Sequence, residues 1–432
     1  CRRGDFHPFP FGYDKVSKAP KLRNDCFALP AGVYWTPVDE ALSLLEARLQ
    51  TVVDNEVCAV EACDGRILAQ AVMAPRSHPP CANSAVDGYV FSGGLTPGAH
   101  CLDLQGGRSA AGEAFGGVVS TGQALRILTG AALPEGADTV VLQEDVTVED
   151  GKLYVNGPLK AGANARKAGE DVECGAELFE AGHRVQPQDI GVLISVGVAE
   201  VEVFKPLRVA IISTGAELCV PGAEVRTDKI FDANRPMLKA VLRRWGMDVV
   251  DMGIVPDNAK LVRQTLDKAA ELADVILTSG GASAGDEDHM SAVLSKTGNM
   301  ALWRIAVKPG RPLALGVWGG VPVFGLPGNP VAAFVCTLIF ARPALLQLSG
   351  AGFLAPQALT LPAAFVKTKK AGRREYLRAR LRDGAIEVFG SEGSGRVSGL
   401  SWADGLVELS DQAAEISAGQ PVTFYPYSVF GL

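Results

Sequence analysis

The stretch from residue 206 to residue 349 restricts the fold most, because apolar runs alternate there with helical patterns. The strand-like runs are 207–213, 248–255, 275–278, 312–316 and 321–324, and the helical patterns are 235–245, 259–272, 287–295 and the apolar segment that begins at Asn329-Pro330. Strands and helices at this spacing are typical of a parallel, doubly wound sheet. Ligands of such sheets bind outside the carboxyl ends of the strands, so a site is expected in the loops that follow them.

The loop after the run 275–278 has the composition of a phosphate-binding loop. The run leads into glycines, serines and three acidic residues, in the order Ser279-Gly280-Gly281-Ala282-Ser283-Ala284-Gly285-Asp286-Glu287-Asp288. Free backbone N–H groups at a helix N-terminus favour an anion, and glycine lets the backbone approach it closely. Acidic residues beside a phosphate imply a divalent cation between them, and we predict Mg²⁺. The alternative is a tight turn with a glycine-rich cap.

Charged residues also follow other strands of the predicted sheet. Glu217 closes the segment Ser213-Thr214-Gly215-Ala216-Glu217, and Asp257 follows the run 248–255. Lys308 and Arg311 stand in the rigid loop Lys308-Pro309-Gly310-Arg311-Pro312, where they would neutralise a phosphate or another tetrahedral oxyanion. The alternative for the acidic residues is that they only cap helix N-termini. The alternative for Lys308 and Arg311 is a basic turn exposed to solvent. The basic run 367–382 is predicted to be a solvated strand face.

Outside this region the sequence predicts shorter elements. Thr36 and Pro37 read as the N-cap and first residue of a helix, and the runs 56–61 and 66–72 flank Asp64-Gly65 as a hairpin. Residues 1–30 are predicted to be an extended or disordered leader. After residue 350 the helical periodicity stops, and short strands with turns predict a small β-barrel or sandwich.

Composition narrows the function classes. The formal net charge of −7 argues against general nucleic-acid binding. No window approaches eighteen consecutive apolar residues, so no membrane-spanning helix is expected. The nine cysteines form no Cys-x-x-Cys pair and no zinc-like cluster with histidine. We therefore expect reduced thiols and a cytoplasmic protein.

Taken together, these segments resemble the family of MoeA, the plant Cnx E-domain and the gephyrin E-domain, the molybdopterin molybdenumtransferases. The match covers about residues 35–430, in order. The segments that carry it are Ala82-Asn83-Ser84-Ala85-Val86-Asp87-Gly88-Tyr89, Thr129–Asp138, Gly169-Glu170-Asp171, Ser213–Leu218, Asp232–Leu238, Ser279–Asp288, Lys308–Pro312, Gly325–Val331, Gly372-Arg373 and Gly393-Ser394-Gly395.

The resemblance implies a multidomain α/β subunit that forms a homodimer with a shared active site. Its central αβα doubly wound domain, of the MogA/MoaB type, binds molybdopterin. The implied division is a discontinuous domain I at 31–75 and 162–205, an inserted β-rich domain II at 76–161, the αβα domain III at 206–349 and a C-terminal β-barrel domain IV at 350–432.

The reaction implied by the resemblance is the Mg²⁺-dependent insertion of molybdate into adenylylated molybdopterin, with release of AMP. The residues implied as catalytic are Asp87, Thr129, Asp171, Glu217, Asp257 and Asp288, of which Glu217, Asp257 and Asp288 would hold Mg²⁺. The residues implied to bind the pterin, its phosphates or molybdate are Ser213, Thr214, Gly215, Ser279, Gly280, Gly281, Ser283, Lys308, Arg311, Pro327, Gly328, Asn329, Pro330, Arg373 and Ser394. Asp87, Thr129 and Asp171 would come from the neighbouring subunit.

One departure from the family pattern concerns activity. The family begins its Asp-Asn-Ser motif with an aspartate, and this chain has Ala82 there. If that carboxylate acts in the chemistry, AMP release by this chain is impaired. Two other functions remain open: the related molybdopterin adenylyltransferase activity, and a gephyrin-like interaction scaffold. The resemblance also implies an adenylyltransferase, as a partner or a fused domain, that supplies the substrate.

Overall fold

The computed structural model describes residues 35–222, 227–280, 289–296, 300–310 and 312–432. The predicted leader at 1–30 lies outside these residues, as do Gly281, Ser283, Asp288 and Arg311. The division into four domains stays a prediction, and the sheets are described below one at a time.

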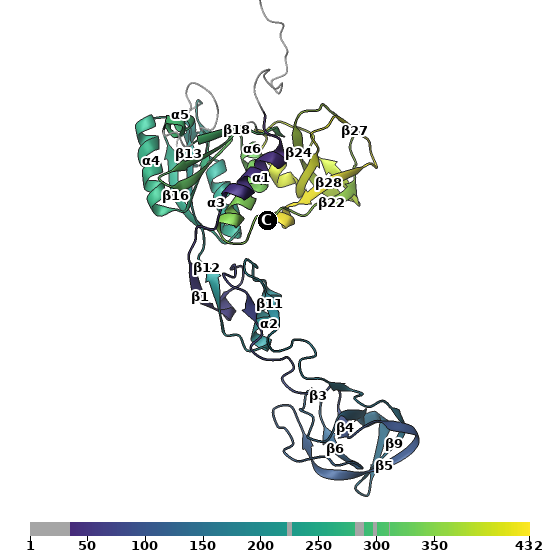
Figure 1. Ribbon diagram of the computed structural model, residues 1–432. Coiled ribbons are helices and arrows are strands. Elements are labelled where there is room, and N and C mark those ends of the chain that lie inside the picture. The colour runs from purple at the N-terminus through teal and green to yellow at the C-terminus, as the bar shows by residue number, and fades with distance from the viewer. Residues whose placement is uncertain (1–34, 223–226, 281–288, 297–299, 311) are drawn as a thin grey trace, which may run out of the picture. The chain divides into compact units, whose positions relative to one another are not determined.

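The region 206–349 contains a six-stranded sheet, here called the α/β sheet (Figure 1). Its strands, in spatial order, are β16 (Asp248–Val255), β13 (Arg208–Thr214), β17 (Val275–Ser279), β21 (Val321–Leu326), β20 (Pro312–Trp318) and β18 (Met300–Arg304). The first four are parallel to one another. β20 is antiparallel to both β21 and β18, so the prediction of a wholly parallel sheet was wrong for this strand.

Helices cover both faces of the α/β sheet, as expected of a doubly wound fold (Figure 1). The helices of this region are α3 (Asn234–Arg244), α4 (Ala259–Leu272), α5 (His289–Lys296), α6 (Pro330–Cys336) and α7 (Arg342–Leu348). Leu238 and Phe334 pack with Ile211 and Leu277 on one face. On the other face, Val262 and Leu266 of α4 and Met290 of α5 pack with Ile212 and Ile276. Because successive side chains of a strand point to opposite faces of the sheet, neighbouring residues of β13 and β17 lie in different apolar clusters.

The helix after Pro330 is nearly all buried. The π-helical turn Thr337–Ala341 joins α6 to α7, and Asn329 occupies the N-cap position without a side-chain hydrogen bond. By length and composition, Pro330–Leu348 is the one candidate membrane span among the described residues, but 89% of its most apolar window is buried inside the protein. That burial is typical of a core helix.

The C-terminal region forms a second six-stranded sheet, here called the barrel sheet. It contains β19 (Val307–Lys308), β24 (Arg374–Arg382), β26 (Gly405–Leu409), β28 (Pro421–Pro426) and β22 (Leu359–Pro362), with β25 (Ala385–Val388) paired to β24. Around it lie β23 (Lys367–Lys369), β27 (Ala414–Ile416), α8 (Ser398–Trp402) and the 3₁₀ turn Tyr427–Phe430. Because β19 pairs with β24, the chain between β18 and β20 is tied to the barrel sheet.

The region 88–159 forms a third six-stranded sheet. Its strands, in spatial order, are β7 (Thr139–Leu142), β4 (Gly88–Phe91), β6 (Gln123–Ile127), β5 (Leu95–Ser109), β9 (Lys152–Leu159) and β8 (Val146–Glu149). A 3₁₀ turn at Gln143–Asp145 follows β7. Two small apolar clusters fill this sheet, one around Val90, Leu125 and Val140 and the other around Phe91 and Leu153.

The remaining described elements are two helices, a 3₁₀ turn and four pairs of short strands. They are α1 (Val38–Arg48), α2 (Pro187–Ser195), the 3₁₀ turn Val60–Ala62, and the strand pairs β1 (Asn55–Ala59) with β12 (Glu200–Phe204), β2 (Val72–Met73) with β11 (Glu177–Phe179), β3 (Asn83–Ser84) with β10 (Ala165–Arg166), and β14 (Leu218–Cys219) with β15 (Ile230–Phe231).

Two local predictions in the N-terminal region were wrong. The hairpin around Asp64-Gly65 does not form, because β1 pairs with β12 instead, about 140 residues further along the chain. Thr36 is not an N-cap: α1 begins after Pro37, and Thr36 forms a β-bridge with Ile305. The seven cysteines in the described ranges are all free thiols.

Candidate active site

The loops after β13 and β16 are joined by a carboxylate. The backbone N–H of Ala216 donates to Asp257 Oδ2 at 2.8 Å. A Cβ atom on Gly215 would lie 2.6 Å from Glu217 Oε2, so the Glu217 carboxylate folds back over the glycine backbone. Glu217 and Asp257 therefore belong to one pair of linked loops at the carboxyl edge of the α/β sheet.

The loops after β17 and β21 meet at the same edge. The backbone N–H of Gly280 donates to the Leu326 carbonyl at 3.2 Å, and a Cβ atom on Gly328 would lie 3.7 Å from Gly280 Cα. At Gly280 itself, φ is +86° and a Cβ atom would lie 2.5 Å from the Thr214 carbonyl oxygen. Only glycine fits such a backbone conformation and such a close approach.

Asn234, the first residue of α3, ties these loops together. Its Nδ2 donates to Ser279 Oγ at 2.8 Å and to the Gly328 carbonyl at 2.7 Å. The next residue, Arg235, bridges Asp232 and Asp251 at 2.9 and 2.7 Å. Burial would lower the pKa of Arg235, but its bonds to the two aspartates raise the pKa above its usual range. Asn234 is thus a positioning residue that sequence reasoning missed, although the helix-initiating Asp-x-Asn-Arg motif was its signal.

Buried polar atoms at this edge lack partners within the described part of the chain. Four such oxygens are Ser213 Oγ, Thr214 Oγ1, Thr278 Oγ1 and Asn234 Oδ1. Each of these residues is at most 7% exposed. Buried polar groups in folded proteins are nearly always hydrogen-bonded, so this cluster marks a place where a polar ligand would complete the hydrogen bonding.

The carboxylates of this edge suit a Mg²⁺ ion that takes only some of its ligands from the protein. The described residues contain no group of three or more His, Cys, Asp and Glu side chains that could hold a metal. Mg²⁺ commonly takes one or two carboxylates and completes its shell with water and phosphate oxygens. Glu217 and Asp257 suit that pattern, and Asp288 lies outside the described residues.

Lys308 lies where the α/β sheet region meets the barrel sheet. Its Nζ contacts Glu392 Oε2 at 2.5 Å and Glu375 Oε2 at 3.5 Å. A Cβ atom on the neighbouring Gly310 would lie 3.6 Å from Pro327 Cγ. The loop Pro327–Pro330 is therefore adjacent to the segment that carries Lys308.

Two further predicted residues come from the barrel region. The Ser394 carbonyl accepts a hydrogen bond from the backbone N–H of Val331 at 3.1 Å, which places Ser394 at the first turn of α6. Arg373 stands directly before β24 and is half-buried. Its charge, after the larger effect of burial, helps to lower the pKa of Lys369.

The predicted residues of the N-terminal half form their own group. Thr129 donates to Asp87 Oδ1 through both its backbone N–H and its hydroxyl, each at 2.7 Å, and these bonds lower the pKa of Asp87. Asp171 is exposed, and its backbone N–H donates to the His78 carbonyl at 3.1 Å. Ala82 is half-buried and its carbonyl accepts from Leu133.

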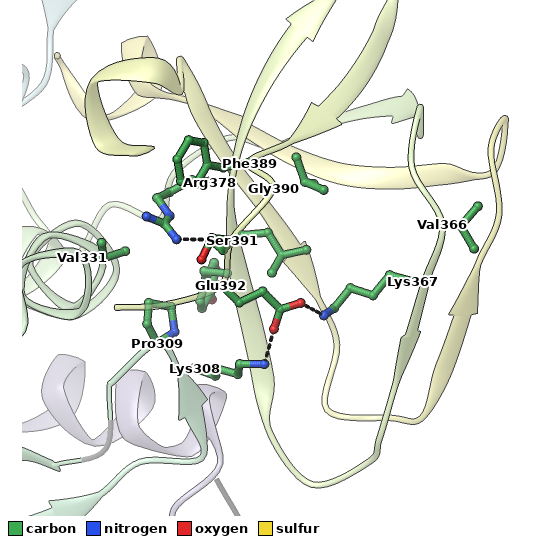
Figure 2. A pocket seen from close by; sticks show the side chains of 13 residues that line it. Lys308, Pro309, Val331, Val366, Lys367, Arg378, Phe389, Gly390, Ser391 and Glu392 are labelled. Carbon is green, nitrogen blue, oxygen red and sulfur yellow. Dashed lines mark hydrogen bonds and ion pairs between the residues drawn. The ribbon is translucent and has the colours of Figure 1, made fainter. Parts of the chain in front are cut away.

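The barrel region also contains a pocket of about 200 Å³ that the sequence did not predict (Figure 2). Lys308, Lys367, Arg378 and Glu392 line it. The prediction that the run 367–382 is a solvated strand face was wrong, since the residues Lys369, Glu375 and Arg378 are at most 8% exposed. Charge alternation looks the same in a solvated face and in an internally paired cluster, so the sequence contained no signal that separates them.

Family models match most of the chain. They are the MoeA N-terminal region (domain I and II) at residues 36–197, the probable molybdopterin binding domain at 210–347 and the MoeA C-terminal region (domain IV) at 360–427. A relative from Haemophilus influenzae, named molybdopterin molybdenumtransferase, is 34% identical over 399 residues, which are 90% of this chain and 98% of that relative.

The chain belongs to the molybdopterin molybdenumtransferase family.

Other members support this assignment. A molybdopterin molybdenumtransferase from a Nostoc species is 31% identical, with 88% of this chain and 90% of the relative covered. The structure of a molybdopterin biosynthesis MoeA protein from Pyrococcus horikoshii has a TM-score of 0.79 and 27% identity, and it covers 91% of this chain and 100% of that chain.

In this member of the molybdenumtransferase family, most of the predicted site residues that the structure describes thus fall into two groups. Asp87 and Thr129 form one group. The other is the carboxyl edge of the α/β sheet, made up of Ser213, Thr214, Gly215, Glu217, Asp257, Ser279, Gly280, Pro327, Gly328, Asn329 and Pro330, with Lys308 and Ser394 adjoining it.

Proposed function

We propose that this chain inserts molybdenum from molybdate into molybdopterin, and that its substrate is the adenylylated form, from which it releases AMP. Membership of a family of transferases in molybdenum cofactor biosynthesis supports the first part. The observation that carries the second part is the set of linked loops at the carboxyl edge of the α/β sheet, with glycines, carboxylates and unpartnered buried polar atoms in one place. Such an edge suits a phosphorylated ligand.

Each part of this edge has a role in the proposal. The backbone around Gly215 and Gly280 approaches the phosphates, and the hydroxyls of Ser213 and Thr214 donate to ligand oxygens. Glu217 and Asp257 would hold Mg²⁺, which when bound neutralises phosphate charge. Lys308, with the adjoining Ser394, binds the oxyanion.

We further propose a homodimer in which Asp87 and Thr129 of one subunit face the sheet edge of the other, as the family resemblance implies. The exposed Asp87 carboxylate supports this, because its two hydrogen bonds from Thr129 hold it charged and in a fixed orientation. We also propose a cytoplasmic location and an adenylyltransferase, as a partner or a fused domain, that supplies the substrate.

The chain and its Ala82→Asp variant provide the test. Both are incubated with adenylylated molybdopterin, molybdate and Mg²⁺, and both AMP release and formation of active cofactor are measured. We expect slow AMP release from the chain itself and release at least tenfold faster from Ala82→Asp, because a carboxylate can accept a proton or bind a cation where an alanine cannot; such groups contribute roughly 10²–10⁴ in rate.

Ala114→Asp is the control, because Ala114 is an exposed alanine of the same region and is not part of the Asn83–Asp87 motif. Cofactor formed by neither the chain nor Ala82→Asp would refute the proposed function. Cofactor formed at equal rates by both would leave the function standing and show that this carboxylate is dispensable.

A further inference from the structure

Two lysines from separate elements converge on one carboxylate in the barrel pocket (Figure 2). Lys308 belongs to β19 and Lys367 to β23. Lys308 Nζ contacts Glu392 Oε2 at 2.5 Å, and Lys367 Nζ contacts the other oxygen, Glu392 Oε1. The two oxygens of Glu392 therefore bridge two cations, as two oxygens of a tetrahedral oxyanion would.

A second carboxylate, Glu375, is a permanent partner of the same lysines. It lies 3.5 Å from Lys308 and 3.3 Å from Lys367, and its side chain is 11% exposed. Glu375 stands inside β24, opposite Leu409 of β26, so the barrel sheet fixes its position. By contrast, the side chain of Glu392 is 46% exposed and follows β25 on a loop.

Arg378 fixes the backbone of that loop. Its guanidinium donates to the carbonyls of Ser391, Gly393 and Arg396, the last two at 3.2 and 2.7 Å. Arg378 is 4% exposed, and it stacks on the Phe389 ring with 4.8 Å from Cζ to the ring centroid. Because the loop is held through its carbonyls, the Glu392 side chain can turn toward solvent while the loop keeps its place.

The pocket has room for such an exchange. Its volume is about 200 Å³. With Glu375 and Glu392 in place, two carboxylates face the three cations Lys308, Lys367 and Arg378. With Glu392 turned out, the pocket has two positive charges in excess, beside the Pro327–Pro330 loop and the candidate active site.

We propose that Glu392 is an internal competitor for an oxyanion: its carboxylate holds the oxyanion position between Lys308 and Lys367, and a bound oxyanion displaces it, with Lys367 as a second binding cation. This inference rests on the proposed function, in which Lys308 binds the oxyanion. The ligand class is a tetrahedral oxyanion, supplied either as molybdate or as a phosphate group.

The charge states agree with direct competition between anions. Burial would raise the pKa of Glu392, but hydrogen bonds from Lys308 and Lys367 outweigh it and hold the pKa below the usual range. Burial likewise would lower the pKa of Lys367, and Glu392 and Glu375 together raise it. At neutral pH Glu392 and Lys367 are therefore charged, and an arriving oxyanion must replace a carboxylate rather than fill a neutral space.

The test measures the affinity of the whole 432-residue chain for oxyanions by equilibrium dialysis, with molybdate in one arm and inorganic phosphate in the other. The Glu392→Gln variant keeps the size of the side chain and removes its charge, and we expect it to bind the preferred oxyanion about tenfold more tightly. Lys367→Met is expected to weaken binding at least tenfold. Glu387→Gln is the matched control, because Glu387 pairs with Arg380 at 2.7 Å and does not line the pocket.

The outcomes separate this inference from the function on which it rests. Tighter binding by Glu392→Gln alone, with weaker binding by Lys367→Met, supports the inference, and the arm that responds identifies the oxyanion. Glu392→Gln affinity within twofold of the unchanged chain overturns it, even if Lys308→Met abolishes binding and the chain still forms cofactor. If Glu387→Gln tightens binding as much as Glu392→Gln, the effect is general electrostatics and the inference is also overturned.

Discussion

Replacing Glu217 by glutamine is expected to slow AMP release at least a hundredfold, which corresponds to about 2.7 kcal/mol of activation free energy. Glutamine has the same size as glutamate but neither the negative charge nor the cation affinity of a carboxylate. Glu217 folds over Gly215, and the next amide, that of Ala216, is bonded to Asp257. A substitution there removes charge from the place where we expect the cation and the phosphates to meet.

The measurement is the rate of AMP release as a function of Mg²⁺ concentration, made in the Ala82→Asp background if the chain itself is too slow. The expected signature is a large loss of rate together with a higher Mg²⁺ requirement. Glu271→Gln, at an exposed position of α4, serves as the matched control. A Glu217→Gln variant that keeps its rate within threefold at every Mg²⁺ concentration would remove Glu217 from the site.

The largest expected loss of stability follows from Gly88→Ala. A Cβ atom there would lie 1.8 Å from the Val141 carbonyl oxygen and 2.8 Å from the Val141 carbonyl carbon. These are backbone atoms of β7, which pairs with β4, so the clash can be relieved only by separating the two strands. We expect a loss of about 3 kcal/mol or more in the stability of the sheet at 88–159.

Hydrogen exchange read by mass spectrometry localises this effect. In the Gly88→Ala variant, the amides of β4, β6 and β7 should lose protection, while those of β13 and β17 in the α/β sheet should not change. Gly106→Ala is the control in the same sheet, because an added Cβ atom at that position meets nothing within 4 Å. Unchanged exchange in β4 of the Gly88→Ala variant would contradict the close approach of the two strands.

The sequence predicted the parallel half of the α/β sheet well, because each strand there is a short, mostly apolar run between periodic helices. The structure has β16 at Asp248–Val255 and α4 at Ala259–Leu272, the ranges that the pattern indicated. The loops gather at one edge for the same reason, since parallel strands place all their carboxyl ends together. Thus Glu217, Asp257 and Gly280 could be grouped from topology alone.

One turn signal in the sequence led to a wrong prediction, and another was overlooked. Asp64-Gly65 looked like a hairpin turn, but the flanking β1 found its partner in β12. Gly319-Gly320, with φ values of +56° and +86°, does connect an antiparallel pair, β20 and β21. A Gly-Gly pair between two strand-like runs is a strong hairpin signal, and it could have revealed the reversed strand.

The pocket around Glu392 could not have been predicted from the sequence. Lys308, Lys367 and Glu392 are separated by 59 and 25 positions in the printed sequence. They meet only because β19 leaves the α/β region to pair with β24 and because Arg378 holds the loop 391–396 through its carbonyls. Such long-range pairing leaves no periodic trace in the local sequence.

A crystal structure of the chain with AMP, molybdate and Mg²⁺ tests the central claim most directly. We predict that the AMP phosphate binds against the backbone of Thr214–Gly215 and Ser279–Gly280, with Mg²⁺ about 2.0–2.1 Å from carboxylate oxygens of Glu217 and Asp257 and with Asp87 of a second subunit facing them. AMP bound with its phosphate away from these loops, or Mg²⁺ held by other residues, would contradict the account.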